Sequence, residues 1–349
     1  MSSFGAEAFG GCCQSVLASL PGEAEIDILV SPDAASEVQD WVRETGRPGP
    51  TRIVNAPPEL DFSLWVQDVF AIRAGIPRLV MPAEFDRYHD LKAAAFLADA
   101  AGLATERLDY AFEGGNVLAC DDWLLIGGDG VGPDGADAHA LAAALDPHRT
   151  PVVLECAEAL PAEQTRPIPG QGAGWTETLY HCEFLGRRQP LFHIDLFVAP
   201  AGRTGAGQPQ FLVGCPRMGA EMLGHALPEH ALAPAFDEIA AQLEAAGAAV
   251  LRNPMPLIWV DDVDKRHRTW FHLPVNNVLV EDCGPAGRHV LLPCFAQDDW
   301  SELDLIDAAN RALWERLGFT VQPIPDLLPL AENRGALHCM CKVIERRPA

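Results

Sequence analysis

The chain has few features of a secreted, membrane or metal-scaffold protein. Its first fourteen residues contain no basic residue, and no run of about eighteen apolar residues occurs anywhere in its 349 residues. Its ten cysteines include no CxxC pair, so zinc-finger spacing is missing, and they are too sparse for a disulfide scaffold. We therefore expect a reduced, cytoplasmic protein that does not associate with a membrane.

Basic residues are also scarce. The chain has 25 Lys and Arg but 49 Asp and Glu, giving a net charge of -24 and a pI near 4.7. The electrostatic field of such a charge repels nucleic acid and anionic membranes and attracts cationic ligands, although a need for solubility alone would also explain the acidic excess. With 48% hydrophobic residues, we expect residues 1–349 to form a single α/β domain with a substantial core. The oligomeric state is left open, a homo-oligomer included.

One pattern of elements recurs five times along the chain. Strands are expected at 64–72, 112–119, 192–199, 275–280 and 339–344, and the first four are each followed by a partner strand and then a helix. A polar residue opens each unit, and the alternative to a true repeat is coincidence, since strands often begin with Asp or Asn. Units of this kind predict a radial or stacked array, and in a radial array the polar residues that open the units, here called the openers, would point to a central pocket. The openers are Asp68, Asn116, Asp195, Asn277 and Cys339.

The polar residues at these positions predict a site for a cation. Asp68, Glu113 and Asp195 are acids in otherwise apolar segments, where an unpaired carboxylate is costly, although each one alone fits an edge or bulge position. A planar guanidinium group pairs well with two carboxylates. Cys339 follows a glycine turn, and a thiolate there, served by His193 for proton transfer, is a candidate nucleophile; the alternative is an inert buried thiol.

Two neighbouring features add to this hypothesis. Trp65 precedes Asp68 by three residues, and its ring is expected to pack beside a bound cation. The run from His338 to Cys341 suggests a soft-metal site, but strand alternation would send His338 away from Cys339 and Cys341, which makes a poor chelate. The segment 161–178, rich in Gly, Pro and Gln, is expected to be a loop over the pocket.

Four motifs resemble those of the guanidino-group-modifying, or pentein, superfamily. They are Leu-Trp-Val-Gln-Asp at 64–68, Glu-Gly-Gly-Asn at 113–116, His-Ile-Asp at 193–195 and Arg-Gly-Ala-Leu-His-Cys at 334–339. The resemblance spans most of the chain and implies a five-bladed α/β-propeller, the pentein fold. Trp-Val-Gln-Asp at 65–68, and Ile-Pro-Asp at 324–326 with Gly-Ala-Leu-His-Cys at 335–339, are similar to protein-arginine deiminase catalytic domains. Glu-Gly-Gly-Asn, and Arg-Gly at 334–335 with Cys-Met at 339–340, are closer to arginine and agmatine deiminases.

The resemblance implies hydrolysis through a covalent intermediate. Cys339 would attack the guanidinium carbon while Asp68 and Asp195 bind its nitrogens, and His193, oriented by Glu113, would transfer the protons. Further substrate contacts are implied for Trp65, Asn116 and Arg334; Arg334 stands where free-arginine deiminases carry an arginine for the substrate carboxylate, although a surface arginine is an alternative. The implied product is a ureido group, as in citrulline.

One departure concerns calcium. Vertebrate protein-arginine deiminases carry calcium-binding carboxylates just after the first motif, where this chain has Val69 and Ala71, which cannot ligate a hard cation. We therefore expect no metal and no other cofactor.

The candidate substrates are arginine in a polypeptide, free arginine and agmatine. The motif around Cys339 favours polypeptide arginine, that is, a hydrolase of the protein-arginine deiminase type. A small-molecule deiminase, an amidinotransferase and a non-catalytic binding protein remain as alternatives.

Overall fold

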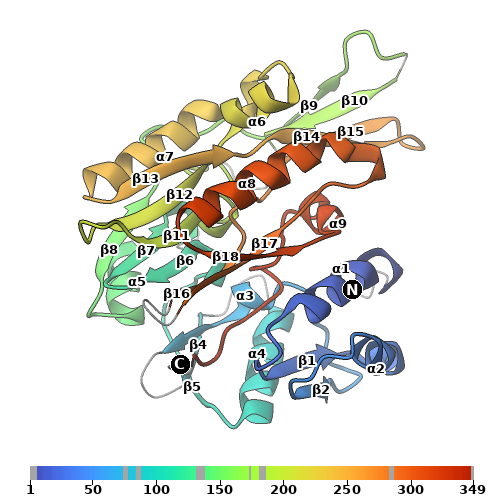
Figure 1. Ribbon diagram of the computed structural model, residues 1–349, viewed down its shortest axis with the longest axis vertical. Coiled ribbons are helices and arrows are strands. Elements are labelled where there is room, and N and C mark those ends of the chain that lie inside the picture. Colours follow the sequence, from blue (N-terminus) through green and yellow to red (C-terminus); the bar gives the residue numbers. More distant parts are fainter. Residues whose placement is uncertain are drawn as a thin grey trace.

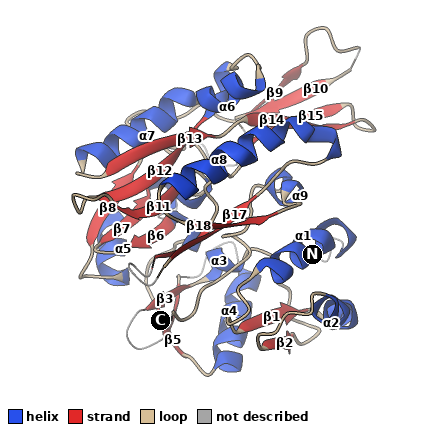
Figure 2. Cartoon of the chain, in the orientation of Figure 1, coloured by secondary structure: helices blue, strands red, loops and turns tan. Residues whose placement is uncertain are grey.

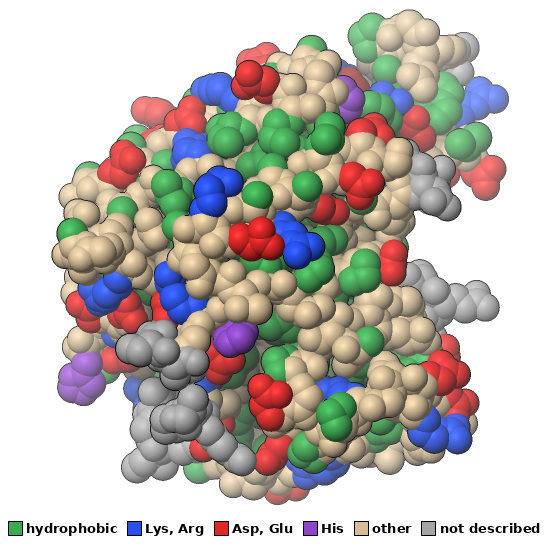
Figure 3. Space-filling model, in the orientation of Figure 1, with side chains coloured by type: hydrophobic (Ala, Val, Ile, Leu, Met, Phe, Trp, Pro, Cys, Tyr) green, Lys and Arg blue, Asp and Glu red, His purple; other side chains and the backbone are tan. Residues whose placement is uncertain are grey.

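The computed structural model describes residues 6–73, 78–83, 88–130, 138–172, 174–180, 186–282 and 287–346. It is an α/β structure in which the strands form several small sheets and helices pack against them (Figures 1 and 2). Within these ranges, no helix is both long and apolar enough to cross a membrane. Acidic, basic and apolar side chains are interspersed over the face shown in Figure 3.

Four three-stranded sheets share one topology. In each, the first two strands are antiparallel and the third is parallel to the second. A parallel partner needs a crossover connection, and a helix lies in each one: α4 (Tyr88–Ala101), α5 (Ala138–Leu145), α7 (Ala233–Ala245) and α8 (Asp304–Arg316). The strands are β3 (Ala71–Arg73), β4 (Arg78–Met81) and β5 (Ala104–Arg107); β6 (Val117–Cys120), β7 (Trp123–Gly127) and β8 (Thr150–Leu154); β11 (Val198–Arg203), β12 (Pro209–Cys215) and β13 (Ala249–Pro254); and β16 (Leu279–Asp282), β17 (Arg288–Pro293) and β18 (Thr320–Ile324).

The polar openers of these four sheets lie in short turns before the strands rather than inside them. Asp68 is in α3 (Val66–Val69), Asn116 in η2 (Gly114–Asn116) and Asp195 in η4 (Ile194–Leu196), while Asn277 lies in a turn just before β16. The expectation of continuous strands over 64–72, 112–119, 192–199 and 275–280 is therefore wrong in the first part of each segment. A single helical turn is too short to show a 3.6-residue period, so it cannot be separated from a strand by apolar spacing.

The expected strand at 339–344 is not formed. Residues 337–340 make a turn and residues 341–346 have no regular structure. The backbone N–H of Cys341 donates to the His338 carbonyl at 3.2 Å, and the Cys339 carbonyl accepts from Gln67 N–H at 3.1 Å. Because these groups bond within the turn and to α3, the start of the segment does not pair with a strand.

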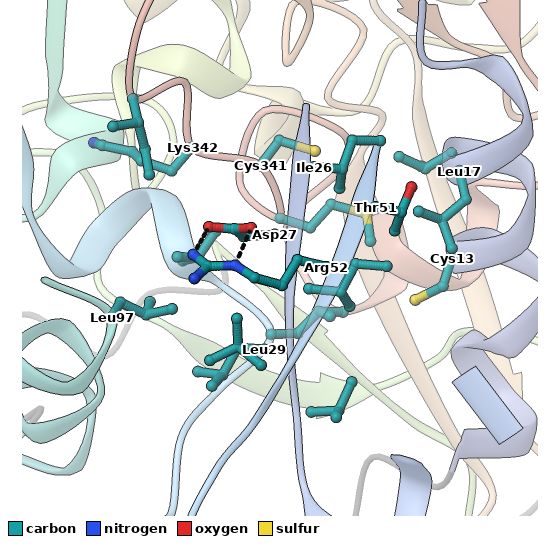
Figure 4. A pocket seen from close by; sticks show the side chains of 18 of the residues that line it. Cys13, Leu17, Ile26, Asp27, Leu29, Thr51, Arg52, Leu97, Cys341 and Lys342 are labelled. Carbon is teal, nitrogen blue, oxygen red and sulfur yellow. Dashed lines mark hydrogen bonds and ion pairs between the residues drawn. The ribbon is translucent and has the colours of Figure 1, made fainter. Parts of the chain in front are cut away.

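A two-stranded parallel sheet at the N-terminal end stands beside this C-terminal segment. It consists of β1 (Ile26–Val30) and β2 (Thr51–Asn55), with α2 (Ala35–Glu44) between them. A cleft of about 2240 Å³ is lined by residues of this sheet, the Asp27–Arg52 ion pair among them, and by Cys341 and Lys342 of the C-terminal segment (Figure 4).

The segment at 161–178 is a hairpin rather than a loop, which corrects the expectation. Its strands β9 (Gln164–Pro167) and β10 (Thr176–Leu179) join β15 (His267–His272) and β14 (Leu257–Asp262) in a sheet that extends to one end of the molecule (Figure 1). The remaining α-helices are α1 (Ala6–Ser19), α6 (Pro216–Leu223) and α9 (Leu328–Glu332). The turn that carries Cys339 belongs to the largest core cluster, so the core itself fixes that residue.

Candidate active site

Cys339 is held in a buried turn that we call the Cys339 loop (residues 333–341). The turn begins after α9, and Gly335 packs against the ring of Trp65 so closely that any Cβ would clash with it. The side chain of Asn277 fastens the loop: its Oδ1 accepts from the N–H groups of Ala336 and Cys339, both at 3.1 Å, and its Nδ2 donates to Cys339 Sγ at 3.1 Å. Cys339 is 2% exposed.

Asp195 lies beside the thiol. Its Oδ2 is 3.8 Å from Cys339 Sγ and 2.7 Å from His338 Nδ1. Its Oδ1 is buried and has no hydrogen-bond partner among the described residues. The expectation that His338 points away from Cys339 is wrong, because alternation along a strand does not apply to a turn.

His193 is buried between two carboxylates. Its Nε2 is 2.8 Å from Glu113 Oε2, and its Nδ1 is 3.4 Å from Asp68 Oδ1, which also accepts from Gly115 N–H at 3.1 Å. Burial alone would lower the pKa of His193, but Asp68 and Glu113 outweigh it and raise that pKa to about 9. This interaction stabilises the fold below about pH 6.5, the ordinary histidine value, and the contribution disappears as pH rises through about 9.

A closed series of hydrogen bonds connects the four turns and the Cys339 loop. Each link joins one unit to the next along the chain, and the last returns from the loop to the first unit. Elements far apart in sequence thus bring their polar residues to one place. The links are Gly115 N–H to Asp68 Oδ1 (3.1 Å), Ile194 N–H to Asn116 Oδ1 (3.2 Å), Asn277 Nδ2 to the Asp195 carbonyl (3.4 Å), Cys339 N–H to Asn277 Oδ1 (3.1 Å) and Gln67 N–H to the Cys339 carbonyl (3.1 Å).

Asn116 and Arg334, both expected to contact substrate, lie in different surroundings. The Asn116 amide bonds to protein groups: its Oδ1 also accepts from Gln189 Nε2 at 2.9 Å, and its Nδ2 donates to the Phe192 carbonyl at 3.4 Å. It therefore fixes the backbone on either side of His193. Arg334 lines a small cavity of about 60 Å³ together with Phe192, the residue before His193.

Lys342, a half-buried lysine next to this cluster, was not among the residues predicted from the sequence. Its Nζ donates to the Gln67 carbonyl at 3.2 Å and lies 5.3 Å from the centre of the Phe70 ring. Burial lowers the pKa of Lys342 to about 8, although Asp68 and Asp195 act in the opposite direction. A lone lysine in the apolar run after Cys339 was the only available signal.

The electrostatics favour a neutral thiol while the site holds no cation. Burial, together with the charges of Asp195 and Asp68, raises the pKa of Cys339 well above the ordinary cysteine value. A cation bound between the two carboxylates would offset their charge and favour the thiolate. In the described ranges, no group of three or more His, Cys, Asp and Glu is arranged to hold a metal ion. Val69 and Ala71 pack in apolar clusters.

Comparison with solved structures shows the fold of the guanidino-modifying deiminases, and the resemblance drawn from the motifs is confirmed at this level. The agmatine deiminase of C. jejuni matches with a TM-score of 0.65 and 11% sequence identity, covering 98% of this chain and 88% of that one. A second structure, provisionally named an agmatine deiminase, matches with a TM-score of 0.64 and 13% identity, covering 96% and 87%. No family model and no curated protein matches the sequence.

Gly115→Ala tests how closely the cluster is packed. A Cβ at this position would lie 2.5 Å from His193 Nδ1 and 2.9 Å from Asp68 Oδ1, so the methyl group must displace one of the two. We expect kcat/KM on a guanidino substrate to fall at least about tenfold, because small misplacements of reacting groups reduce rates steeply. Gly11→Ala is the matched control, since a Cβ there meets no atom within 4 Å. Equal activity in both variants would show that the contact at Gly115 is unimportant.

Proposed function

We propose that this chain is a deiminase that hydrolyses a guanidinium group through a covalent intermediate on Cys339. The observation that carries the proposal is the buried thiol 3.8 Å from Asp195, whose other carboxylate oxygen has no hydrogen-bond partner in the described part of the chain. Asp68, the second carboxylate, contacts His193, the candidate proton carrier. A planar cation with an electrophilic carbon suits such a site, because it would pair with the carboxylates and place its carbon near the sulfur.

The reaction balances with water as the only co-substrate. The Cys339 thiol loses its proton to solvent as its sulfur bonds to the guanidinium carbon, and a C–N bond breaks as His193 gives its proton to the departing ammonia. His193 then takes one proton from water, whose oxygen bonds to the same carbon; the C–S bond breaks and the second proton of the water passes to the sulfur. The products are ammonia, a ureido group and the free thiol. Asp68 and Asp195 hold the nitrogens throughout.

The five-bladed α/β-propeller remains part of this proposal, as does a single domain over residues 1–349. Four sheets of one topology would be four blades, and the β1–β2 sheet beside the C-terminal segment would be the fifth. The closed series of hydrogen bonds supports a radial arrangement, since it returns from the Cys339 loop to α3.

For the substrate we infer a small guanidino compound. The sequence analysis favoured polypeptide arginine, but both structural neighbours above are named as agmatine deiminases. Burial points the same way: Cys339, Asp68, His193 and Asp195 are each at most 3% exposed. A site built from groups this buried suits a small molecule better than a polypeptide loop.

Arg334 provides the test of the substrate. We expect kcat/KM for agmatine or free arginine to exceed that for a blocked arginine ester at least tenfold, because an enclosed site excludes the larger groups. If Arg334 binds a carboxylate, Arg334→Ala should lower kcat/KM for free arginine about tenfold or more and leave agmatine, which has no carboxylate, nearly unchanged. A higher kcat/KM for the ester would instead indicate that the substrate is arginine in a polypeptide.

Glu113→Gln tests the proton carrier. Since His193 must be protonated to release ammonia, wild-type kcat/KM, which reports the free enzyme, should fall as pH rises through about 9. Removing the Glu113 charge lowers the pKa of His193, and a charged hydrogen bond is worth roughly 1.5–3 kcal/mol, so this fall in rate should move to lower pH by about one to two units. Glu37→Gln, at an exposed position in α2, is the control. If the fall in rate at alkaline pH did not shift in Glu113→Gln, His193 would not be the proton carrier.

A further inference from the structure

His338 contacts the centre of the site although it is exposed to solvent at its edge. Its Nδ1 lies 2.7 Å from Asp195 Oδ2, and its backbone N–H donates to the Asn277 carbonyl at 3.2 Å. The His338 side chain is 19% exposed, whereas that of Asp195 is 2% exposed. The bond links segments 143 residues apart. Since the carboxylate is an acceptor, Nδ1 carries the proton in this bond.

The contact matters because the Asp195 carboxylate has few other restraints. Rotation of a carboxylate about its last side-chain bond is soft and roughly two-fold. Asn277 Nδ2 donates to the Asp195 backbone carbonyl and does not hold the carboxylate. Among the described residues, the groups in hydrogen-bond contact with the carboxylate are His338 Nδ1 and the Cys339 thiol, both at Oδ2.

We propose that His338 is a positioning residue: by holding Asp195 Oδ2, it keeps the buried Oδ1 free to pair with an N–H of a bound amidinium or guanidinium. The inference rests on the proposed function and adds a residue that selects planar cations over neutral groups of the same shape. A buried carboxylate oxygen without a hydrogen-bond donor costs free energy. A cationic ligand that donates to this oxygen offsets more of that cost than an uncharged ligand does.

Two alkylating reagents separate this role from a structural one. In 2-chloroacetamidine and 2-chloroacetamide a chloride leaves as the Cys339 sulfur bonds to carbon, and the thiol proton passes to solvent. The first reagent is a planar cation and the second is a neutral molecule of nearly the same shape. Damage to the Cys339 loop would slow both reactions, whereas loss of Asp195 positioning would slow the amidine reaction selectively.

The experiment measures second-order rates of Cys339 alkylation by both reagents for wild type, His338→Phe and His338→Asn. The Asn side-chain nitrogen occupies the place of His Nδ1, so it can restore the bond. His148→Phe, at an exposed position between α5 and β8, is the control. We expect wild type and control to prefer the amidine at least tenfold. His338→Phe should lose about tenfold in the amidine rate and stay within twofold for the amide, and His338→Asn should recover most of the loss.

The outcomes are distinguishable. If wild type prefers the amidine and His338→Phe keeps that preference, or if both of its rates fall equally and Asn rescues neither, His338 does not position Asp195. If wild type itself shows no preference, the proposed function fails, and this inference fails with it. Should His338→Phe not fold, His338→Ala, which removes the bond without adding bulk, is measured in its place.

Discussion

Cys339→Ala is expected to abolish turnover of guanidino substrates while leaving the chain folded. No other group in the proposed reaction can form the bond to the guanidinium carbon, so activity should fall below about a thousandth of wild type. Cys339→Ser should fail similarly, because a serine hydroxyl is a far weaker nucleophile at neutral pH. The measurement is kcat with the best substrate, together with a thermal unfolding curve; we expect the loss of one small buried group to cost on the order of 1 kcal/mol.

Cys341→Ala is the matched control. Cys341 lies two residues further along the chain and lines the cleft of Figure 4, and burial raises the pKa of its thiol to about 12. It should keep most of the wild-type activity. Residual turnover above a thousandth in Cys339→Ala, with the fold intact, would mean that the sulfur is not the nucleophile.

Asp68→Asn and Asp195→Asn are each expected to lower kcat/KM at least about a hundredfold. Each exchange keeps the shape and removes one negative charge from the guanidinium site, and a buried cation left without its partner is costly. The two losses should differ at alkaline pH. Both carboxylates raise the pKa of His193, but Asp68 contacts it and acts more strongly, so Asp68→Asn should move the alkaline fall in rate to lower pH by more than Asp195→Asn does.

Asp307→Asn separates this effect from general damage. Asp307 accepts from the backbone N–H groups of Phe295 and Ala296 through one oxygen, an atom that asparagine retains. Because burial raises the pKa of Asp307 to about 6, its charge does not stabilise the fold, and we expect little loss of stability and nearly unchanged kcat/KM. Wild-type kinetics in either Asp68→Asn or Asp195→Asn would contradict the role of that carboxylate.

The sequence was informative where a pattern is local. A polar residue before an apolar run marked the starts of units at Asp68, Asn116, Asp195 and Asn277, and four of the five predicted units form a three-stranded sheet. The expected strand at 339–344 failed because the Cys339 loop bonds to α3, and apolar spacing does not report such a bond. The turns themselves were missed because one helical turn has no measurable period.

The pairings inside the site were harder to predict. His338 with Asp195, and Lys342 beside Gln67, join segments that spacing along the chain cannot place together. The role of Gly115 depends on where His193 and Asp68 meet, which only the packed structure defines. Residue types could therefore be predicted from motifs, whereas their contacts required the fold.

The most direct test follows the nitrogen atoms. Wild type and Cys339→Ala are incubated with agmatine or arginine labelled with ¹⁵N in the guanidino group, and ammonia and ureido product are quantified. For wild type we predict one labelled ammonia for each ureido group and a transient mass adduct on Cys339. For Cys339→Ala we predict no product and no adduct. A new guanidine without ammonia when an acceptor amine is added, or no turnover by wild type of any guanidino compound offered, would contradict hydrolysis at this site.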